Sequence, residues 1–367
     1  MKKACSRTLP FLLCLSCGAL RAHLLCAQEA SSGFDVRATL TAQVAASNEL
    51  TRAPRSGSPV ILGARSIIYP TWKINDNWFV TGAMQFATRP FFFEDFSTTG
   101  YGAKGNLLQG TLNYSRISSK GSVLVRVGVM STTFGSFMLR YDDADNPLVN
   151  MPIEYGYYYS PVSILGIAGA EVDTTIDKVD ARLQFANSSP ANPRSIFASD
   201  QYGNWAGGAG YTIFQGFRVG LSAYRGPYLD RKSEYFFPGE ANPNTLPATA
   251  FGLDVNWAYG HTSAMGEIQR FVMPYKAIPT FRESAGYGEL KQVLSPRWYI
   301  AVRNGFASTS ATGNQQTLET AAGFRPGRFQ LIKIGYEYEH NSTGANHNDN
   351  TLAIQFITTL HRSVGLE

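Results

Sequence analysis

The sequence is poor in cysteine, in charged side chains and in long apolar runs. Its four cysteines, Cys5, Cys14, Cys17 and Cys26, all lie in a segment with the features of a signal peptide. Without that segment the chain can form neither disulfides nor thiolate metal sites. The rest of the chain never reaches the ~20 continuous apolar residues that a membrane-spanning helix needs, which argues against a helical membrane protein.

Charged residues make up 16% of the chain, whereas a typical soluble domain carries about 25%. The formal charge of +5 comes mostly from Lys2, Lys3, Arg7 and Arg21. Without these four, 28 of the 32 basic residues remain against 27 acidic residues. This near-neutral balance removes the support for nucleic-acid binding through bulk charge.

The N-terminal segment has the three parts of an export signal. A basic start reaches Arg7, an apolar core runs over 9–20, and Leu25-Cys26-Ala27 provides the cleavage site. We expect residues 1–27 to be removed on export and residues 28–367 to form one domain.

From Phe34 onward the chain consists of alternating apolar and polar residues in segments of about ten, which is typical of a transmembrane barrel. Its 19 Tyr, 23 Phe and 35 Gly also favour strands over helices. We predict sixteen strands, near 34–45, 61–72, 77–88, 106–117, 122–132, 166–176, 179–187, 204–214, 217–226, 249–259, 262–272, 281–292, 297–307, 317–325, 328–338 and 351–360.

The connections between these segments alternate in length. Tight-turn sequences such as Asp177-Lys178 and Gln215-Gly216 alternate with longer polar stretches. Bacterial outer-membrane barrels have short periplasmic turns and longer external loops. Residues 133–165 form the longest connection, the third external loop, and we expect it to fold into the lumen.

The two faces of each segment differ in polarity. In 249–259, Phe251, Leu253 and Val255 alternate with Asp254 and Asn256. Taken over sixteen segments, this pattern predicts an all-β fold, a transmembrane antiparallel up-and-down barrel with lipid outside and water inside. Trp and Tyr residues near the strand ends match the aromatic girdles at the two membrane interfaces.

The charged residues of the polar faces are candidates for the pore lining, because such groups set the selectivity of a wide channel. The basic candidates are Arg37, Arg65, Arg126, Arg182, Arg218, Arg303 and Lys333. The acidic candidates are Asp35, Glu171, Asp173, Asp180, Asp254, Glu267 and Glu337. The loop adds a constriction set of Arg140, Asp142, Asp143, Asp145 and Glu154. These charges either create a field across the constriction or pair with one another and keep the wall hydrated.

Two further features of the loop allow more than one interpretation. Tyr155, Tyr157, Tyr158 and Tyr159 either form a stacking surface for solutes or pack the loop against the wall. The run 142–146 lacks the distal Glu of an EF-hand, so we expect no dedicated metal site, and nothing indicates a cofactor.

These features resemble bacterial outer-membrane porins. Arg126-Val127-Gly128 leading into Phe134-Gly135 and an Asp/Asn/Pro-rich loop is similar to the same region of porin O/P-type, phosphate-selective porin-like barrels. The resemblance implies a barrel in outer-membrane lipid, often a homotrimer, that passes small polar or anionic solutes. Two features depart from it: the chain runs past Leu360 to Glu367, and it lacks a dense lysine cluster.

The sequence therefore predicts a passive porin with a mild anion preference and no catalytic residues. Two alternatives remain open. One is a non-conducting, adhesin-like surface barrel. The other is an outer-membrane hydrolase that uses His340 or His347, because such enzymes need a positioned histidine.

Overall fold

The computed structural model describes residues 32–48, 59–88, 91, 103–155, 166–187, 203–226, 247–274, 279–310, 313–342 and 347–365. Sixteen strands make up most of this part: β1 (Gly33–Ser47), β2 (Val60–Lys73), β3 (Trp78–Thr88), β4 (Ala103–Ser118), β5 (Gly121–Met130), β6 (Ile167–Ile176), β7 (Val179–Asn187), β8 (Gly203–Phe214), β9 (Phe217–Gly226), β10 (Ala248–Tyr259), β11 (Thr262–Met273), β12 (Phe281–Ser295), β13 (Trp298–Thr309), β14 (Gly313–Phe324), β15 (Gln330–Asn341) and β16 (His347–Gly365). Two short 3-10 helices, η1 (Phe137–Arg140) and η2 (Ile153–Tyr155), complete it. No helix in the described ranges has the length and apolar character of a membrane span.

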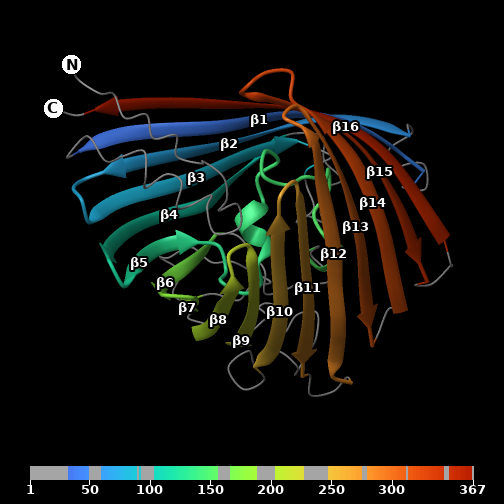
Figure 1. The fold of residues 1–367 in the computed structure, drawn as a ribbon. Coiled ribbons are helices and arrows are strands. Elements are labelled where there is room, and N and C mark those ends of the chain that lie inside the picture. The colour runs from blue at the N-terminus through green and yellow to red at the C-terminus, as the bar shows by residue number, and fades with distance from the viewer. Residues whose placement is uncertain are drawn as a thin grey trace.

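The strands form a single closed sheet. Each strand pairs antiparallel with its neighbours in the sequence, and β1 also pairs with β16 (Figure 1). This pairing runs from Gly33 opposite Gly365 to Ser47 opposite Thr351. The predicted fold class, an antiparallel up-and-down barrel of sixteen strands, is confirmed.

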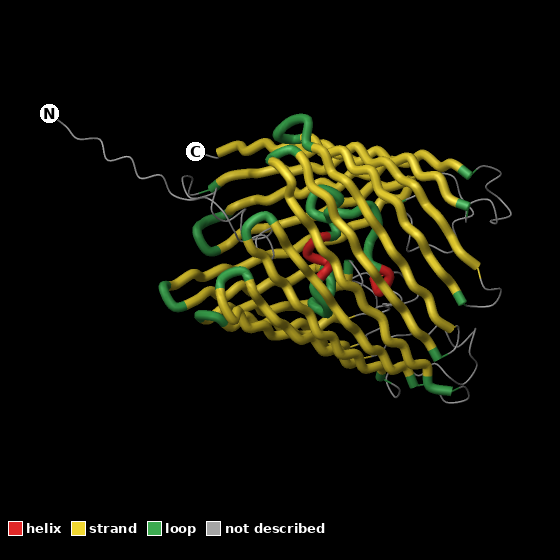
Figure 2. The backbone as a smooth tube through the Cα atoms, turned by 45° about the vertical axis from the view of Figure 1, so that its right-hand side comes forward, coloured by secondary structure: helices red, strands yellow, loops and turns green. Residues whose placement is uncertain are grey.

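Short turns join the strands at one end of the barrel (Figure 2). Several of them need a positive φ angle: Asp177 has φ 54°, Gly216 has φ 90° and Gly260 has φ 57°. Glycine adopts this conformation at no steric cost, and aspartate tolerates it better than most residues. These turn residues therefore allow consecutive strands to reverse direction within two residues.

Several predicted boundaries are wrong by a few residues, and two of the differences have a clear physical reason. The last strand was expected over 351–360, but β16 extends to Gly365 because the first residues of β1 need partners, for example His361 opposite Arg37. The long connection expected over 308–316 shrinks to 310–312, since Thr309 and Gly313 already pair across it.

The outer face of the barrel is apolar and exposed. Leu183 is 55% exposed, Leu253 65% and Ile354 47%, while the alternating residues Gln184, Asp254 and Gln355 are buried. A soluble β-sandwich would show the opposite arrangement. Aromatic pairs such as Trp298 and Phe324, whose ring centroids lie 4.4 Å apart, lie near the strand ends.

One irregularity places an extra residue on the inner face. The register between β3 and β4 shifts where Ala83 and Met84 oppose Gln109 and Leu107. The residue between them, Leu108, is buried, and both Leu108 and Gln109 line the same internal cavity. A bulge of this kind redirects side chains and cannot be read from strict alternation.

We predict that Leu253→Arg weakens folding in lipid vesicles by about 2–4 kcal/mol, since a charge near the middle of a strand would face hydrocarbon. Gln109→Arg is the matched control, because Gln109 faces the internal cavity. Equilibrium folding, followed by the electrophoretic shift between folded and unfolded barrel, measures both. Equal losses for the two variants would contradict the assignment of the faces.

Candidate functional site

The described part of the third loop, residues 131–155, lies inside the barrel (Figures 1 and 2). Its contacts reach strands on opposite sides of the wall, including β2, β11, β13 and β15. The loop therefore crosses the interior and is held by both sides of the wall.

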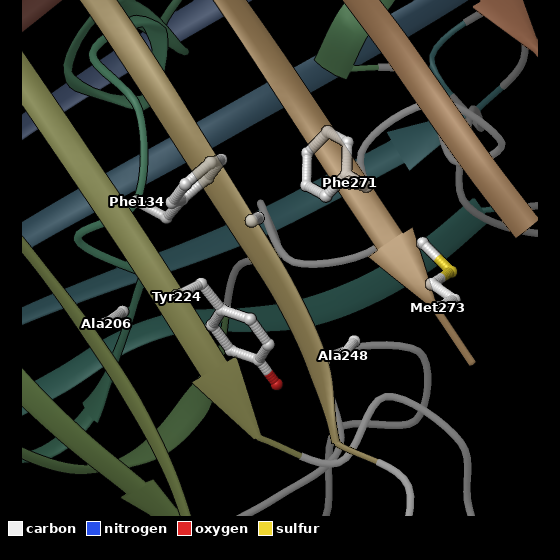
Figure 3. Close-up of a cluster of buried hydrophobic side chains, with 7 residues drawn as sticks. Phe134, Ala206, Tyr224, Ala248, Phe271 and Met273 are labelled. Carbon is white, nitrogen blue, oxygen red and sulfur yellow. The ribbon is translucent and has the colours of Figure 1, made fainter. Parts of the chain in front are cut away.

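Apolar loop residues fit into sites formed by small wall residues. Phe134 packs among Ala206, Ala248, Ala250 and Phe271 (Figure 3). Elsewhere Leu148 contacts Ala301 and Ala321, and Val149 contacts Ala45 and Ala353. The inner face is therefore not uniformly polar: small side chains leave room where the loop packs against the wall.

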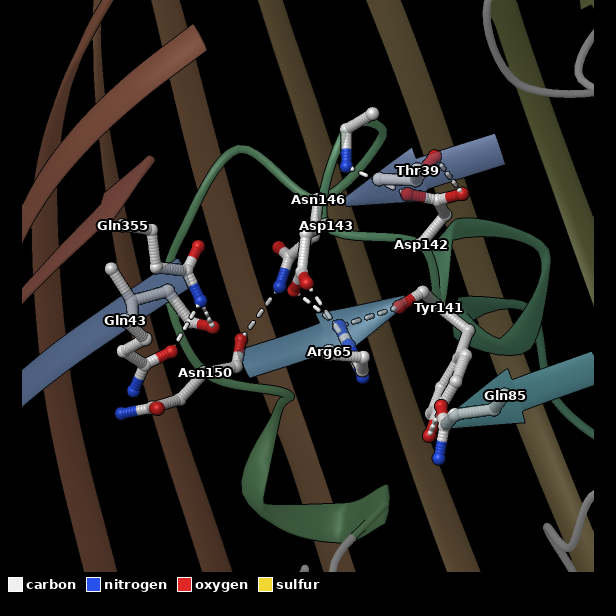
Figure 4. Close-up of polar contacts among 12 residues, drawn as sticks. Thr39, Gln43, Arg65, Gln85, Tyr141, Asp142, Asp143, Asn146, Asn150 and Gln355 are labelled. Carbon is white, nitrogen blue, oxygen red and sulfur yellow. Dashed lines mark hydrogen bonds and ion pairs between the residues drawn. The ribbon is translucent and has the colours of Figure 1, made fainter. Parts of the chain in front are cut away.

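A cluster of acidic loop residues contacts β1 and β2 (Figure 4). Asp142 accepts hydrogen bonds from Thr39 at 2.8 Å and Tyr69 at 2.7 Å, and it lies 3.4 Å from Arg37. The next residue, Asp143, forms a two-point ion pair with Arg65, whose Nε lies 3.0 Å from Oδ2. These bonds fix the position of the loop along the barrel axis.

A second set of charges fixes the loop to the opposite wall. Arg140 donates to Glu289 at 2.7 Å, and Arg303 donates to the same carboxylate at 2.6 Å. Arg303 also reaches Glu319 at 3.2 Å, and Glu319 accepts the backbone N–H of Val149 at 2.8 Å. Removing one partner would leave a buried charge unpaired, which typically costs 3–5 kcal/mol.

Lys333 is fully buried and holds the loop through its backbone. Its ammonium donates to the carbonyls of Asp143 at 3.1 Å, Asn146 at 3.1 Å and Leu148 at 2.7 Å. Three acceptors satisfy the three N–H groups of a lysine. This residue therefore secures the turn in the middle of the loop.

The carboxylate of Glu267 on β11 fixes the start of the loop to its end. It accepts hydrogen bonds from Ser136 Oγ at 2.8 Å and from Tyr155 Oη at 2.7 Å. The Tyr155 ring also lies 5.2 Å from Phe137, between centroids. Tyr155 therefore packs the loop, whereas Tyr157, Tyr158 and Tyr159 lie outside the described residues.

Three of the predicted basic residues lie on β5, β7 and β9. Arg126 pairs with Glu171 at 2.5 Å and with Asp173, and Arg218 lies between Asp180 at 2.7 Å and Asp254 at 2.6 Å. Arg182 donates to the Gly135 carbonyl at 2.6 Å. No carboxylate of the described residues lies within ion-pair distance of Arg182.

A cavity of about 160 Å³ lies between the loop and β1–β7. Seven predicted site residues line it: Asp35, Arg37, Arg126, Asp142, Asp145, Glu171 and Arg182. The other predicted basic and loop residues lie elsewhere: Arg65, Arg140, Arg303, Lys333, Asp143 and Glu154 pack between loop and wall, and Arg218 lies on β9. Burial raises the pKa of Asp145, and Asp142 adds to the rise while Arg37 opposes it.

The sequence did not single out several residues that shape this site. Thr39, Tyr69 and Glu289 are ordinary inward positions whose role depends on loop residues that lie 73 to 149 residues away in the sequence. Leu108 enters through the bulge. Among the described residues no group of three or more His, Cys, Asp or Glu is placed to hold a metal ion.

No protein-family model and no curated protein sequence matches the chain. Several solved structures have a similar fold. An anion-selective porin from Comamonas acidovorans has a TM-score of 0.63 at 10% identity, with 90% of this chain and 100% of that chain covered. The outer membrane channel DcaP of Acinetobacter baumannii has a TM-score of 0.62 at 9% identity, with 91% of this chain and 99% of that chain covered. The trimer form of OmpT, an outer membrane protein of Vibrio cholerae, has a TM-score of 0.60 at 12% identity, with 90% of this chain and 100% of that chain covered. The chain thus has the fold of bacterial outer-membrane porins and channels.

We predict that Gly135→Ala loosens the loop. Gly135 has φ 80°, and an added Cβ would collide with the Tyr155 hydroxyl and lie 2.6 Å from the Glu267 carboxylate. The strain alone costs about 1–3 kcal/mol. Gly260→Ala is the control, because its φ is 57° but nothing lies within 4 Å of the added Cβ. Hydrogen exchange over 131–155 should accelerate in the first variant only; unchanged protection there would contradict the proposed role of Glu267.

Proposed function

We propose that this protein is an outer-membrane porin, a passive channel for small hydrophilic solutes that pass between the third loop and β1–β7. The observation that carries the proposal is the internal cavity, which polar and charged side chains of both wall and loop line. A wall of sixteen strands is too wide to be filled by its own side chains. The loop would then narrow the channel without filling it.

The lining supports only a small ion preference, and the mild anion preference expected from the sequence stays a prediction. Four acidic residues, Asp35, Asp142, Asp145 and Glu171, face three arginines. Arg37 and Arg126 are paired with carboxylates. Arg182 is the lining arginine with no described carboxylate at ion-pair distance, and it is the group we assign to attract anions.

The proposed setting follows from the same fold. Residues 1–27, which lie outside the described part, would direct export to the outer membrane, and membrane lipid would cover the apolar outer face. A homotrimer is consistent with the trimer form of the similar OmpT. The closer resemblance to porin O/P-type barrels stays a prediction.

The hydrolase alternative, which depends on His340 or His347, stays a prediction. His340 Nδ1 lies 2.7 Å from Asn348 Oδ1, and His347 Nε2 lies 3.4 Å from Asp349. Where β1 pairs with β16, His361 contacts both Asp35 and Ser363 through the same ring nitrogen, at 2.6 Å and 3.4 Å. A catalytic relay needs the carboxylate and the hydroxyl on different nitrogens. The adhesin-like alternative requires a sealed lumen.

We expect the purified protein to give stepwise current increases in planar bilayers. Deleting residues 137–154 should enlarge each step, because this segment obstructs the interior. A protein that inserts without conducting would contradict the proposal and favour the surface-binding alternative.

Reversal potentials in a salt gradient should lie near zero for the natural protein. Arg182→Glu should shift them toward cation selectivity and Asp145→Asn toward anion selectivity, since each variant changes one charge of the lining. Arg225→Glu is the control, because Arg225 is an exposed residue of β9 and does not line the cavity. A shift of equal size in this control would contradict the proposed path.

A further inference from the structure

Glu154 is a buried carboxylic acid that has no hydrogen-bond donor on any other described residue. It lies in η2, and its side chain is 0% exposed. Within the described part of the chain, neither of its carboxylate oxygens accepts a hydrogen bond from a neighbouring residue. Burying a carboxylate in this way is so costly that such groups usually remain protonated.

One carboxylate, Glu267 on β11, and two arginines, Arg140 on η1 and Arg303 on β13, act on the charge of Glu154. Both arginines already pair with wall carboxylates: Arg140 and Arg303 with Glu289 on β12, and Arg303 also with Glu319 on β14. Tyr287 on β12 and the adjacent Tyr155 complete the titratable groups around it. Both arginines donate to other carboxylates, and within the described part of the chain no ion pair joins either of them to Glu154.

Burial raises the pKa of Glu154 well above its ordinary value, and the charge of Glu267 adds to the rise, while a hydrogen bond from its own backbone N–H, Arg303 and Arg140 oppose it. Below this raised pKa the neutral form fits its buried site. Above it a negative charge would lie beside the Glu267 carboxylate, which holds Ser136 and Tyr155.

The position of this contact determines what its loss would do. On one side of the loop Phe137, Arg140 and Tyr155 pack against β11–β13. On the other side Met138 and Leu139 line the cavity. A loop detached from β11–β13 would therefore move into the passage.

We propose that Glu154 is a proton-dependent clasp: the loop stays seated on β11–β13 while this carboxyl is protonated, and ionisation at higher pH releases it toward the passage. The effect on transport rests on the proposed porin function. The proposed pH dependence of loop packing on β11–β13 does not rest on that function.

The direction of the pH effect follows from the linkage between proton binding and the packing of the loop. The seated loop binds one proton more than the released loop at every pH between the ordinary and the raised pKa of Glu154. The contribution of Glu154 to seating is thus complete at low pH and declines as pH rises through that window, by up to about tenfold per pH unit for one proton.

Hydrogen exchange over 131–155, corrected for intrinsic rates and measured from about pH 5 to about pH 10, tests the clasp directly. Protection of the natural protein should fall with rising pH, and Glu154→Gln should abolish the fall because it keeps a neutral side chain of the same shape. Glu283→Gln is the control: Glu283 on β12 is also buried and its oxygens also lack partners, but it is not on the loop. The control should retain the full pH dependence.

Bilayer conductance provides the second readout. Rising pH should lower the open conductance and increase closures in the natural protein and in Glu283→Gln, but not in Glu154→Gln. A pH dependence of loop protection that persists in Glu154→Gln, or its absence from the natural protein, overturns the clasp. A barrel that never conducts but shows the pH-dependent protection supports the clasp and overturns the porin function instead.

Discussion

The constraint on which this structure depends is that backbone N–H and C=O groups must be satisfied within the wall. In hydrocarbon each unpaired group costs several kcal/mol, so an open sheet edge cannot face lipid. The chain meets this requirement by pairing β1 with β16 over fifteen positions, from Gly33 to Ser47. Closure therefore explains why β16 extends to Gly365.

Closing sixteen strands creates an interior that wall side chains alone cannot fill. The chain solves this by returning one loop into the barrel and matching it to the inner face. Alanines provide space for Phe134, Leu148 and Val149, and charges pair where the loop is polar. Buried ion pairs contribute little net stability compared with apolar packing, but they specify one seating, because an alternative seating leaves charges unpaired.

Alternation of side chains was enough to predict the barrel and the inward direction of residues such as Arg65, Arg303 and Lys333. It could not predict their partners. Arg140 and Glu289 lie 149 residues apart, and their contact depends on the path of an irregular loop. The bulge at Leu108 and the end of β16 were missed for a related reason: both depend on the neighbouring strand and not on the local pattern.

Two buried ionisable residues at the loop, Lys333 and Glu154, show how the same burial leads to different outcomes. Lys333 meets three backbone carbonyls at 2.7 to 3.1 Å, so its charged form replaces the hydrogen bonds that water would provide. Glu154 has no hydrogen-bond donor on any other described residue, so burial favours its neutral form. The lysine therefore holds the loop through its charged form, whereas we propose that the glutamate holds it through its neutral form. Burial sets the cost of a charge, but the hydrogen bonds within reach decide whether the charge remains.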